Sequence, residues 1–530
     1  QNAQFISTLP VCQNRRKHAS LSETRNLRAT MPHEILTPQE MADVDAAAIA
    51  AGPFDGYRLM LNAGAALTAE VMRRYPGAAR FDVLAGPGNN GGDGYVVARL
   101  LAEAGCAVNV WAHGKPRPGS DAELAARDCP VAAKPFVDYR PDPASLVVDA
   151  LYGAGLARPL DAAFGPVFDA IESAGAPVVA VDLPSGLSGL IGRAGGPCPQ
   201  ADLTVTFVRL KPGHLLEPGR SLCGEVVVAD IGIADSVVGA RDLHANDPTL
   251  WLGSLPRPAT DTHKYARGHV AVFSGPPSAT GAARLSAMAA ARAGAGAVTV
   301  LSPPAALQVN AAHLTSVMLR RIDGAADAVG FLAERKVRAA VLGPGFGDAE
   351  RLGETALTLL DNVSAPFTLV LDADAFTAFA DAPASMFISA GASKASLVLT
   401  PHEGEFARLF GDIAGDGALS KVEKARAAAA RAHAAVVLKG PDTVVAAPDG
   451  RAVINANGSP FLATAGSGDV LAGLIAGFSA QGMDAFAAAC AGVWIHAEAG
   501  GRFGPGLIAE DLPGLVPPIL KGLFARVASG

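Results

Sequence analysis

The sequence lacks the features that mark several classes of protein. No apolar run approaches the ~20 residues that a membrane-spanning helix requires, and we expect the longest alanine-rich run, 485–495, to be a buried helix. The six cysteines form no CxxC pair and have no metal-type spacing, so we expect reduced thiols in a cytoplasmic protein. The net charge is −7 without long runs of one sign, which argues against nucleic-acid binding.

The length and composition are those of a multidomain globular protein. Half of the 530 residues are hydrophobic and 18% are charged, which predicts two or three domains with sizeable cores. Residues 1–30 are polar, basic and almost free of acidic residues. A transit peptide has such a composition, but we expect a disordered extension.

Residues 31–235 have the pattern of an α/β domain. Thr37 and Glu40 are predicted to form the capping box of a first helix, with Pro38 at its first position. The spacing between later apolar runs leaves room for crossover helices, and continuous rather than alternating apolar strands are typical of a parallel sheet covered on both faces. The predicted strands are 81–86, 108–112, 146–153, 178–186, 203–207 and 225–233.

A second α/β domain is predicted over 263–530. Prolines and polar residues interrupt the rhythm after the first series, and we place a linker at 236–262. The two series share no clear repeat, so we expect two different folds. The strands of the second series are expected within 269–275, 297–301, 339–345, 368–375, 396–405 and 435–447.

The stretch GPGNNGGDG, residues 86–94, lies between a predicted strand and a predicted helix. Its spacing does not match a dinucleotide fingerprint, and glycines that supply positive φ in a turn would explain it equally well. Asn90 in this stretch, with Asp149 and Ser185 after neighbouring strands, offers the oxygen ligands that a hard cation prefers. Asp182 ends another strand and can act as an acid or a base. Ligands bind at this edge of parallel sheets, so the sequence predicts a site there.

The stretch AGSGD, residues 465–469, precedes an apolar helix. Amides at a helix N-terminus bind phosphate, and Asp469 beside them would act on a substrate hydroxyl. An aspartate that merely favours the helix dipole is the alternative. His402 follows a strand and is either a structural or a catalytic histidine. No second histidine accompanies it, so we reject a zinc site.

The first series of motifs closely resembles the NAD(P)H-hydrate epimerase domain, through GPGNNGGDG, DALYGAG, AVDLPSGL and the KPG of 211–213. One departure is Leu61, where an acidic residue is expected. The resemblance implies that Asp182 is the catalytic carboxylate and that K⁺ is bound by Asn90, Asp149 and Ser185. It implies substrate contacts from Asn89, Asn90, Gly91, Gly92, Asp93, Gly153, Ala154, Gly155, Leu156, Ala157, Arg158, Pro159 and Asp182.

The second series resembles the ADP-dependent NAD(P)H-hydrate dehydratase, a ribokinase-like family, through ATAGSGD, TPHEGE and KGPDT. Ser467 stands where threonine is usual, and its hydroxyl is retained. The resemblance implies ADP as co-substrate, Mg²⁺, and Asp469 as a catalytic residue. The implied hydrate-binding residues are Ala282, Gly345, His402 and Asp469, and the implied nucleotide-binding residues are Lys439, Gly440, Pro441, Asp442, Thr443 and Gly468.

We therefore predict a Rossmann-like three-layer domain fused to a ribokinase-like α/β domain, with both activities. The substrates would be the hydrates of NADH and NADPH together with ADP, and no nucleic acid or membrane partner is expected. We also expect a homo-oligomer. Two alternatives are a ribokinase-like vitamin kinase and a noncatalytic N-terminal binding module. The noncatalytic module is disfavoured because the N-terminal domain carries all four predicted site residues, namely Asn90, Asp149, Asp182 and Ser185.

Overall fold

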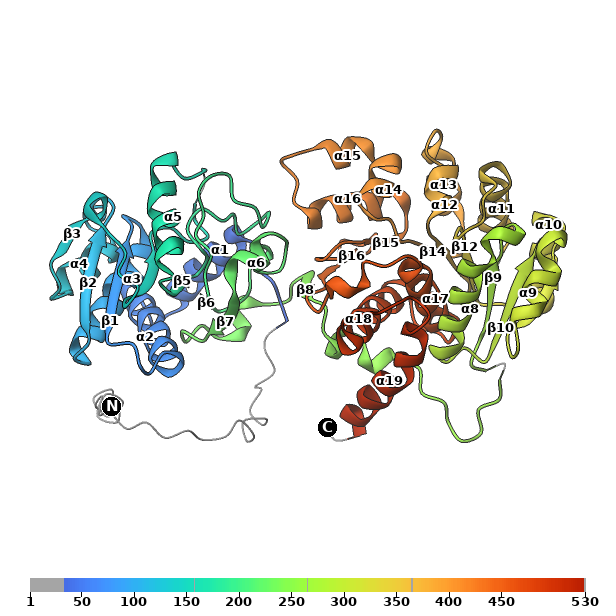
Figure 1. Cartoon of the computed structure of the whole chain (residues 1–530), viewed down its shortest axis with the longest axis horizontal. Coiled ribbons are helices and arrows are strands. Elements are labelled where there is room, and N and C mark those ends of the chain that lie inside the picture. The colour runs from blue at the N-terminus through green and yellow to red at the C-terminus, as the bar shows by residue number, and fades with distance from the viewer. Residues whose placement is uncertain (1–32, 157, 265, 364–365, 529–530) are drawn as a thin grey trace. The chain divides into compact units, whose positions relative to one another are not determined.

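The computed structural model describes residues 33–156, 158–264, 266–363 and 366–528 (Figure 1). The chain divides into two compact units, Gln1–Arg241 and Asp242–Gly530. The predicted extension at 1–30 and the predicted substrate contact Ala157 lie outside the described residues. Within the described residues no helix is both long enough and apolar enough to cross a membrane.

The first unit is built on a seven-stranded parallel sheet with the order β3-β2-β1-β4-β5-β6-β7. Neighbouring strand residues face opposite sides: Val83 joins a core with α1–α4, and Leu84 joins a core with α5. The strands are β1 Arg80–Ala85, β2 Ala107–Ala112, β3 Ala133–Pro135, β4 Leu146–Ala150, β5 Val178–Val181, β6 Leu203–Phe207 and β7 Glu225–Ala229. The helices are α1 Pro38–Ala51, α2 Gly56–Arg74, α3 Asn89–Glu103, α4 Asp121–Asp128, α5 Gly165–Ala174, α6 Gly219–Cys223 and α7 Asp235–Val238.

The predicted capping box of α1 is present. The Glu40 amide donates to Thr37 Oγ1 at 3.2 Å, and the Thr37 amide donates to Glu40 Oε2 at 2.8 Å. Two of the four amides that a helix leaves unpaired at its start thereby gain hydrogen-bond acceptors. Leu61, the departure from the epimerase pattern, lies on α2 and packs against the apolar core.

The second unit has a ten-stranded sheet with the order β11-β10-β9-β12-β13-β14-β15-β16-β17-β8. Only β16 runs against its neighbours among the described strands. The strands are β8 Leu243–Ala245, β9 His269–Phe273, β10 Ala297–Ser302, β11 Met318–Arg321, β12 Ala339–Leu342, β13 Thr368–Leu371, β14 Ser396–Leu399, β15 Ala435–Leu438, β16 Val444–Ala446 and β17 Ala452–Ile454.

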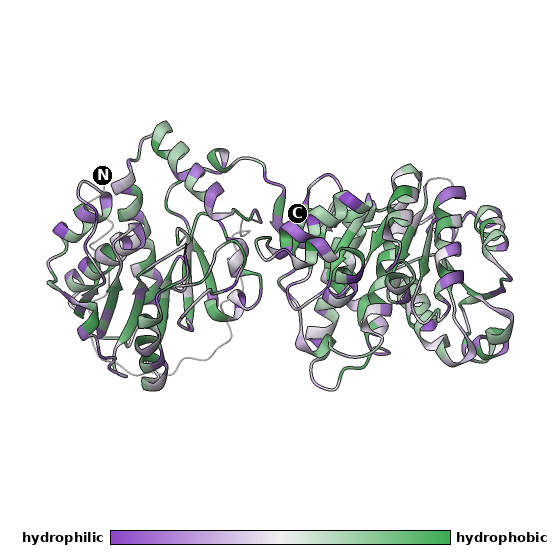
Figure 2. Ribbon diagram, turned by 90° about the horizontal axis from the view of Figure 1, so that it is seen from above, coloured by the Kyte–Doolittle hydropathy of each residue, from purple (hydrophilic) through white to green (hydrophobic). Residues whose placement is uncertain are grey.

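Helices cover the second sheet, and its strands are largely hydrophobic, as Figure 2 shows for both units. The run 485–495, predicted to be a buried helix, lies within α18 and contributes Cys490 and Ile495 to the core. The helices are α8 Thr280–Arg292, α9 Leu307–His313, α10 Ala325–Glu334, α11 Ala349–Asn362, α12 Asp374–Ala378, α13 Pro383–Ala392, α14 Glu403–Leu409, α15 Gly411–Gly415, α16 Lys421–Ala432, α17 Ser467–Ala480, α18 Ala485–Phe503 and α19 Leu512–Ala528.

The prediction of a linker at 236–262 was wrong for much of that segment. β8 pairs with β17 at the edge of the second sheet, and Trp251 is buried in the core of the second unit. The Trp251 indole donates to Asn246 Oδ1 at 3.1 Å. The prolines and polar residues that suggested a linker belong to short turns, because a three-residue strand carries too little apolar pattern to be recognised.

Candidate active sites

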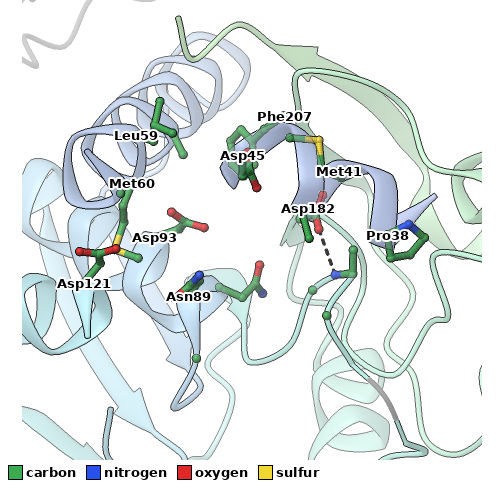
Figure 3. A pocket seen from close by; sticks show the side chains of 18 of the residues that line it. Pro38, Met41, Asp45, Leu59, Met60, Asn89, Asp93, Asp121, Asp182 and Phe207 are labelled. Atoms are coloured by element: carbon green, nitrogen blue, oxygen red, sulfur yellow. Dashed lines mark hydrogen bonds between the residues drawn. The ribbon is translucent and has the colours of Figure 1, made fainter. Parts of the chain in front are cut away.

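A pocket of about 470 Å³ lies in the first unit at the carboxyl ends of its strands. Asn89, Asn90 and Asp93 at the start of α3 line it together with Asp182 after β5 (Figure 3). Gly153, Ala154, Gly155 and Leu156 also line it, whereas Arg158 and Pro159 are not among its lining residues. The pocket therefore brings together most of the residues predicted for the epimerase.

The NNGGD stretch is the first part of α3 rather than a loop, which corrects the predicted helix start. Its amides face the pocket from a helix N-terminus, where they suit an anion. None of the five glycines in 86–94, all of them described, has positive φ. Close packing requires four of them instead, Gly88 being the exception: a Cβ on Gly91 would lie 1.9 Å from the Gly86 carbonyl oxygen. Gly91 and Gly92 are buried, and neither lines the pocket.

Asp182 is held in one position by several hydrogen bonds. Its Oδ1 accepts from Lys211 Nζ at 2.7 Å and from Thr206 Oγ1 at 2.8 Å. Its Oδ2 accepts from the Ala154 amide at 3.0 Å. Its backbone φ is 64°, a strained value for a residue other than glycine. Burial would raise the pKa of Asp182, but the Lys211 ammonium outweighs it and the pKa is about 2.

Two other carboxyl groups in the pocket have raised pKa values. Burial raises the pKa of Asp45 on α1 to about 6, with Lys211 opposing the shift and Asp182 adding to it. Burial raises the pKa of Asp93 well above its usual range, and the charges of Asp182 and Asp45 add to this. Nothing in the sequence marked Asp45, since an aspartate within an amphipathic helix is ordinary. Lys211 stood in the KPG motif but was not singled out.

The predicted cation ligands lie at adjoining strand ends. Ser185 Oγ donates to Asp149 Oδ1 at 2.6 Å, and the Ser185 amide donates to Asp149 Oδ2 at 2.8 Å. Asp149 is 1% exposed and has no cationic partner among the described residues. Burial raises its pKa, and the bonds from Ser185 oppose this. The Asn90 carboxamide lies beside the Val181 carbonyl and the Gly153 amide.

A second group of charged residues gathers in the second unit around Lys439, which follows β15. Its Nζ donates to Asp372 Oδ1 at 2.9 Å and lies 3.7 Å from Glu405 Oε2. Burial would lower the pKa of Lys439, but Asp372, Glu405 and Asp469 raise it above its usual value. A Cβ on Gly468 would lie 3.4 Å from Lys439 Nζ, so the start of α17 adjoins this ammonium.

Asp469 lies in the first turn of α17, after Gly466 with φ 85°. Burial raises the pKa of Asp469 to about 7, helped by the charge of Asp372 and opposed by Lys439. The sequence analysis did not select Asp372 as a site residue. The two aspartates near the end of the run 368–375 were the available signal, since they mark a polar strand end. A carboxyl group with this pKa can give up or accept a proton near neutral pH.

The other predicted dehydratase residues fall into two sets. Ala282 and Gly345 lie together, since a Cβ on Gly345 would be 3.2 Å from the Ala282 methyl. His402 caps α14: its Nδ1 accepts from the Gly404 amide at 3.0 Å, and its imidazole is more than half exposed. A parallel bridge joins His402 to Lys439.

The KGPDT stretch forms a turn after β15. The Gly440 amide donates to Thr443 Oγ1 at 3.1 Å, and Thr443 Oγ1 donates to the Gly440 carbonyl at 2.8 Å. Asp442 pairs with Lys421 at 2.5 Å, a lysine that the sequence analysis did not select. This ion pair ties the turn to the start of α16.

Comparisons with known proteins decide the family. A family model described as NAD(P)H-hydrate dehydratase matches residues 270–507, and one described as YjeF-related protein N-terminus matches 56–213. The bifunctional NAD(P)H-hydrate repair enzyme of Moorella thermoacetica is 37% identical over 526 residues, covering 93% of this chain and 98% of that protein. The chain belongs to this family. The enzyme of the same description from Escherichia coli K12 is 34% identical over 472 residues, 86% of this chain and 88% of that protein.

Membership of the NAD(P)H-hydrate repair family confirms the two-part enzyme and the two α/β folds that the motifs predicted, and it sets aside the vitamin-kinase alternative. A solved structure of an ADP/ATP-dependent NAD(P)H-hydrate dehydratase from Bacillus subtilis, co-crystallized with ATP/Mg²⁺, is 26% identical. The match covers 53% of this chain and 98% of the Bacillus subtilis chain, with a TM-score of 0.45.

Proposed function

We propose that the first unit interconverts the R and S hydrates of NADH and NADPH, and that the second dehydrates the S hydrate. The second reaction would consume ADP and release AMP and phosphate. The observation that supports this best is the pairing of two separate strand-end sites in one chain of this family, one around Asp182 and one around Asp469. Because only one epimer is dehydrated, the first reaction supplies the second.

In the first site, the hydrated nucleotide would lie across the start of α3 and the 153–156 turn. The amides at the start of α3 suit its phosphates. The ionised carboxylate of Asp182, fixed by Lys211 and the Ala154 amide, would accept a hydrogen bond from the hydrated ring. Asn89, Asn90 and Asp93 would contact the substrate from α3, while Gly91 and Gly92 would act by letting the helix approach closely.

We also propose a K⁺ ion held by Asn90, Asp149 and Ser185. The donor set fits: Asp149 is a buried carboxylate without a cationic partner among the described residues. With the Asn90 amide nitrogen donating to the Val181 carbonyl at 3.0 Å, its carboxamide oxygen lies 3.3 Å from the Gly153 amide. Carboxylate, carboxamide and hydroxyl oxygens are ligands of the kind that a hard cation prefers. The ion would supply positive charge beside the substrate.

In the second site, Asp469 would accept the proton of the substrate hydroxyl as it takes up a phosphoryl group. The turn 439–443 with Gly468 would bind the nucleotide, and Ala282, Gly345 and His402 would contact the hydrate. The described residues contain no cluster of three metal-binding side chains. We therefore propose that Mg²⁺ enters with the nucleotide, held chiefly by phosphate oxygens and water.

The proposed function is tested by recovery of NADH absorbance from a mixture of the two hydrates, with ADP and ATP supplied separately. Complete recovery requires both activities. Recovery that stops when the S hydrate is used up would support the dehydratase activity and contradict the epimerase activity. No recovery with either nucleotide would overturn the assignment of the second unit.

Potassium dependence is a separate expectation for the first site. Replacing K⁺ with tetramethylammonium should slow conversion of R to S hydrate, because the buried Asp149 charge then lacks a counterion. Asp149→Asn should abolish the response to K⁺. The measurement is the epimerisation rate as K⁺ is titrated back. An equal rate without K⁺ in the unmodified protein would contradict the proposed ion.

We further propose that the protein works in the cytoplasm and forms a homo-oligomer. The first proposal rests on the cysteines, since the five that the structure describes are all free thiols, as expected in a reducing compartment.

A further inference from the structure

Asp182 is poorly suited to exchange a proton. Lys211, Thr206 and the Ala154 amide already donate to its two oxygens. A pKa of about 2 keeps it ionised at every pH at which the protein would work. A general acid or base needs a pKa near the working pH and a free position toward the substrate. The epimerase site therefore needs another proton-exchanging group.

Asp45 meets both requirements. It projects from α1 into the same pocket as Asp182 and Asp93, as Figure 3 shows. Its carboxyl group has no hydrogen-bond partner among the described residues, so its oxygens are open to a ligand in the pocket. The charged groups around it are Lys211, Asp182 and Asp93, with Asp121 on the pocket wall.

Asp93 is the competing candidate from α3. Its pKa lies well above the usual range, because burial and two neighbouring carboxyl groups oppose its ionisation. Its surroundings therefore favour the protonated form, which suits a hydrogen-bond donor. The pKa of Asp45 is about 6, so both of its forms are populated near neutral pH. Carboxyl groups whose environments separate their pKa values take different roles in one site.

We propose that Asp45 is the group that exchanges a proton with the hydroxyl of the hydrate during epimerisation, with Asp182 as the fixed, ionised contact. This rests on the proposed epimerase function of the first unit. Asp45 would thus be a second catalytic residue of this site, contributed by the N-terminal helix rather than by the sheet.

The chemistry balances without a further reactant. The hydroxyl of the hydrate is on the carbon beside the ring nitrogen. As the C–O bond breaks, the nitrogen lone pair forms a C=N bond, and the proton of Asp45 converts the leaving hydroxyl to water. Water then adds to the other face as the planar ring turns about its bond to the ribose. The π-electron pair of the C=N bond returns to the ring nitrogen, and a proton of the added water goes to Asp45.

The test uses the full chain and the purified R hydrate of NADH, with formation of the S hydrate followed by chromatography and the uncatalysed rate subtracted. Asp45→Asn should lower kcat at least about 100-fold, the usual contribution of a general acid or base, with little change in KM. Asp45→Glu should retain activity within about tenfold. The matched control is Asp43→Asn, an exposed aspartate on the same helix, which should behave as the unmodified protein.

The pH profile separates proton transfer from a structural role. The R hydrate requires protonated Asp45, so kcat/KM of the unmodified protein should fall as pH rises through about 6. Asp45→Asn should remove this descending limb of the pH profile, and Asp45→Glu should shift the pH at which the limb falls. Epimerisation in H₂¹⁸O should place ¹⁸O in the hydrate, because the C–O bond is broken and remade.

Dehydration of the S hydrate with ADP is the control for intact protein. A normal epimerisation rate and an unchanged limb in Asp45→Asn would overturn the proposal while the epimerase stands. If Asp45→Asn also loses dehydration, Asp45→Glu decides: a shifted limb supports the proposal and an unshifted limb overturns it. An unmodified protein that never converts R to S hydrate would overturn the epimerase function itself.

Discussion

Replacing Asp469 with asparagine should lower the rate of nucleotide-driven dehydration at least about 100-fold and leave epimerisation unchanged. Asparagine keeps the shape of the side chain but cannot accept the proton of the substrate hydroxyl. The amides at the start of α17 remain, so the KM for the nucleotide should change little. The measurement is recovery of NADH absorbance from the S hydrate with saturating ADP.

The pH dependence of dehydration gives the same residue a second signature. Burial raises the pKa of Asp469 to about 7, and the ionised form is the one that accepts a proton. For the free protein, kcat/KM should therefore rise with pH up to about 7 and then level off. Asp361→Asn, an exposed aspartate at the end of α11, is the matched control. A rate that stays normal in Asp469→Asn would remove the catalytic role.

Asp469 should also cost the protein stability. Its folded pKa lies above the ordinary value, so the unfolded chain releases its proton first and folding is weakened as pH rises from about 4 to about 7. Asp469→Asn should consequently raise the Tm of the second unit at pH 8 and have little effect at pH 4. A loss of activity with a gain in stability is the behaviour of a group retained for catalysis.

Replacing Lys211 with methionine should both abolish epimerisation and destabilise the first unit by about 3–5 kcal/mol, the usual result of leaving a buried charge unpaired. Lys211 is 1% exposed, and its ammonium donates to Asp182 and Thr206. Without it, burial raises the pKa of Asp182, because the remaining donors carry no full charge at neutral pH. Denaturant unfolding of the first unit measures the change.

The depressed pKa of Asp182 determines how the stability of the first unit depends on pH. Its ion pair stabilises the unmodified protein above about pH 4, and this contribution is lost as pH falls toward 2. The loss should be absent in Lys211→Met. Adding Asp182→Asn to Lys211→Met should recover much of the stability but none of the activity, since both buried charges are then gone. Lys115→Met, an exposed lysine, is the control. Stability losses that simply add would show that the two residues are not coupled.

Family membership and both folds were predictable from the sequence because the evidence is local. The apolar runs of a parallel sheet, the capping box at Thr37 and the two glycine-rich strand ends each lie within a few consecutive residues. The start of α3 was misplaced because its glycines resemble a turn. Only the packing shows that Gly91 is needed for the approach of the Gly86 carbonyl rather than for positive φ.

By itself, the sequence determined where the strands and their polar ends occur, since burial of both sheet faces demands continuous apolar runs. Tertiary structure alone decided which charges meet. Lys211 reaches Asp182 across 29 positions, Lys439 reaches Asp372 across 67, and Asp45 arrives at the first pocket on a helix outside the sheet. Three aspartates, Asp182, Asp45 and Asp469, have pKa values of about 2, 6 and 7 according to their burial and neighbouring charges, and those are set by chain segments far apart in the sequence.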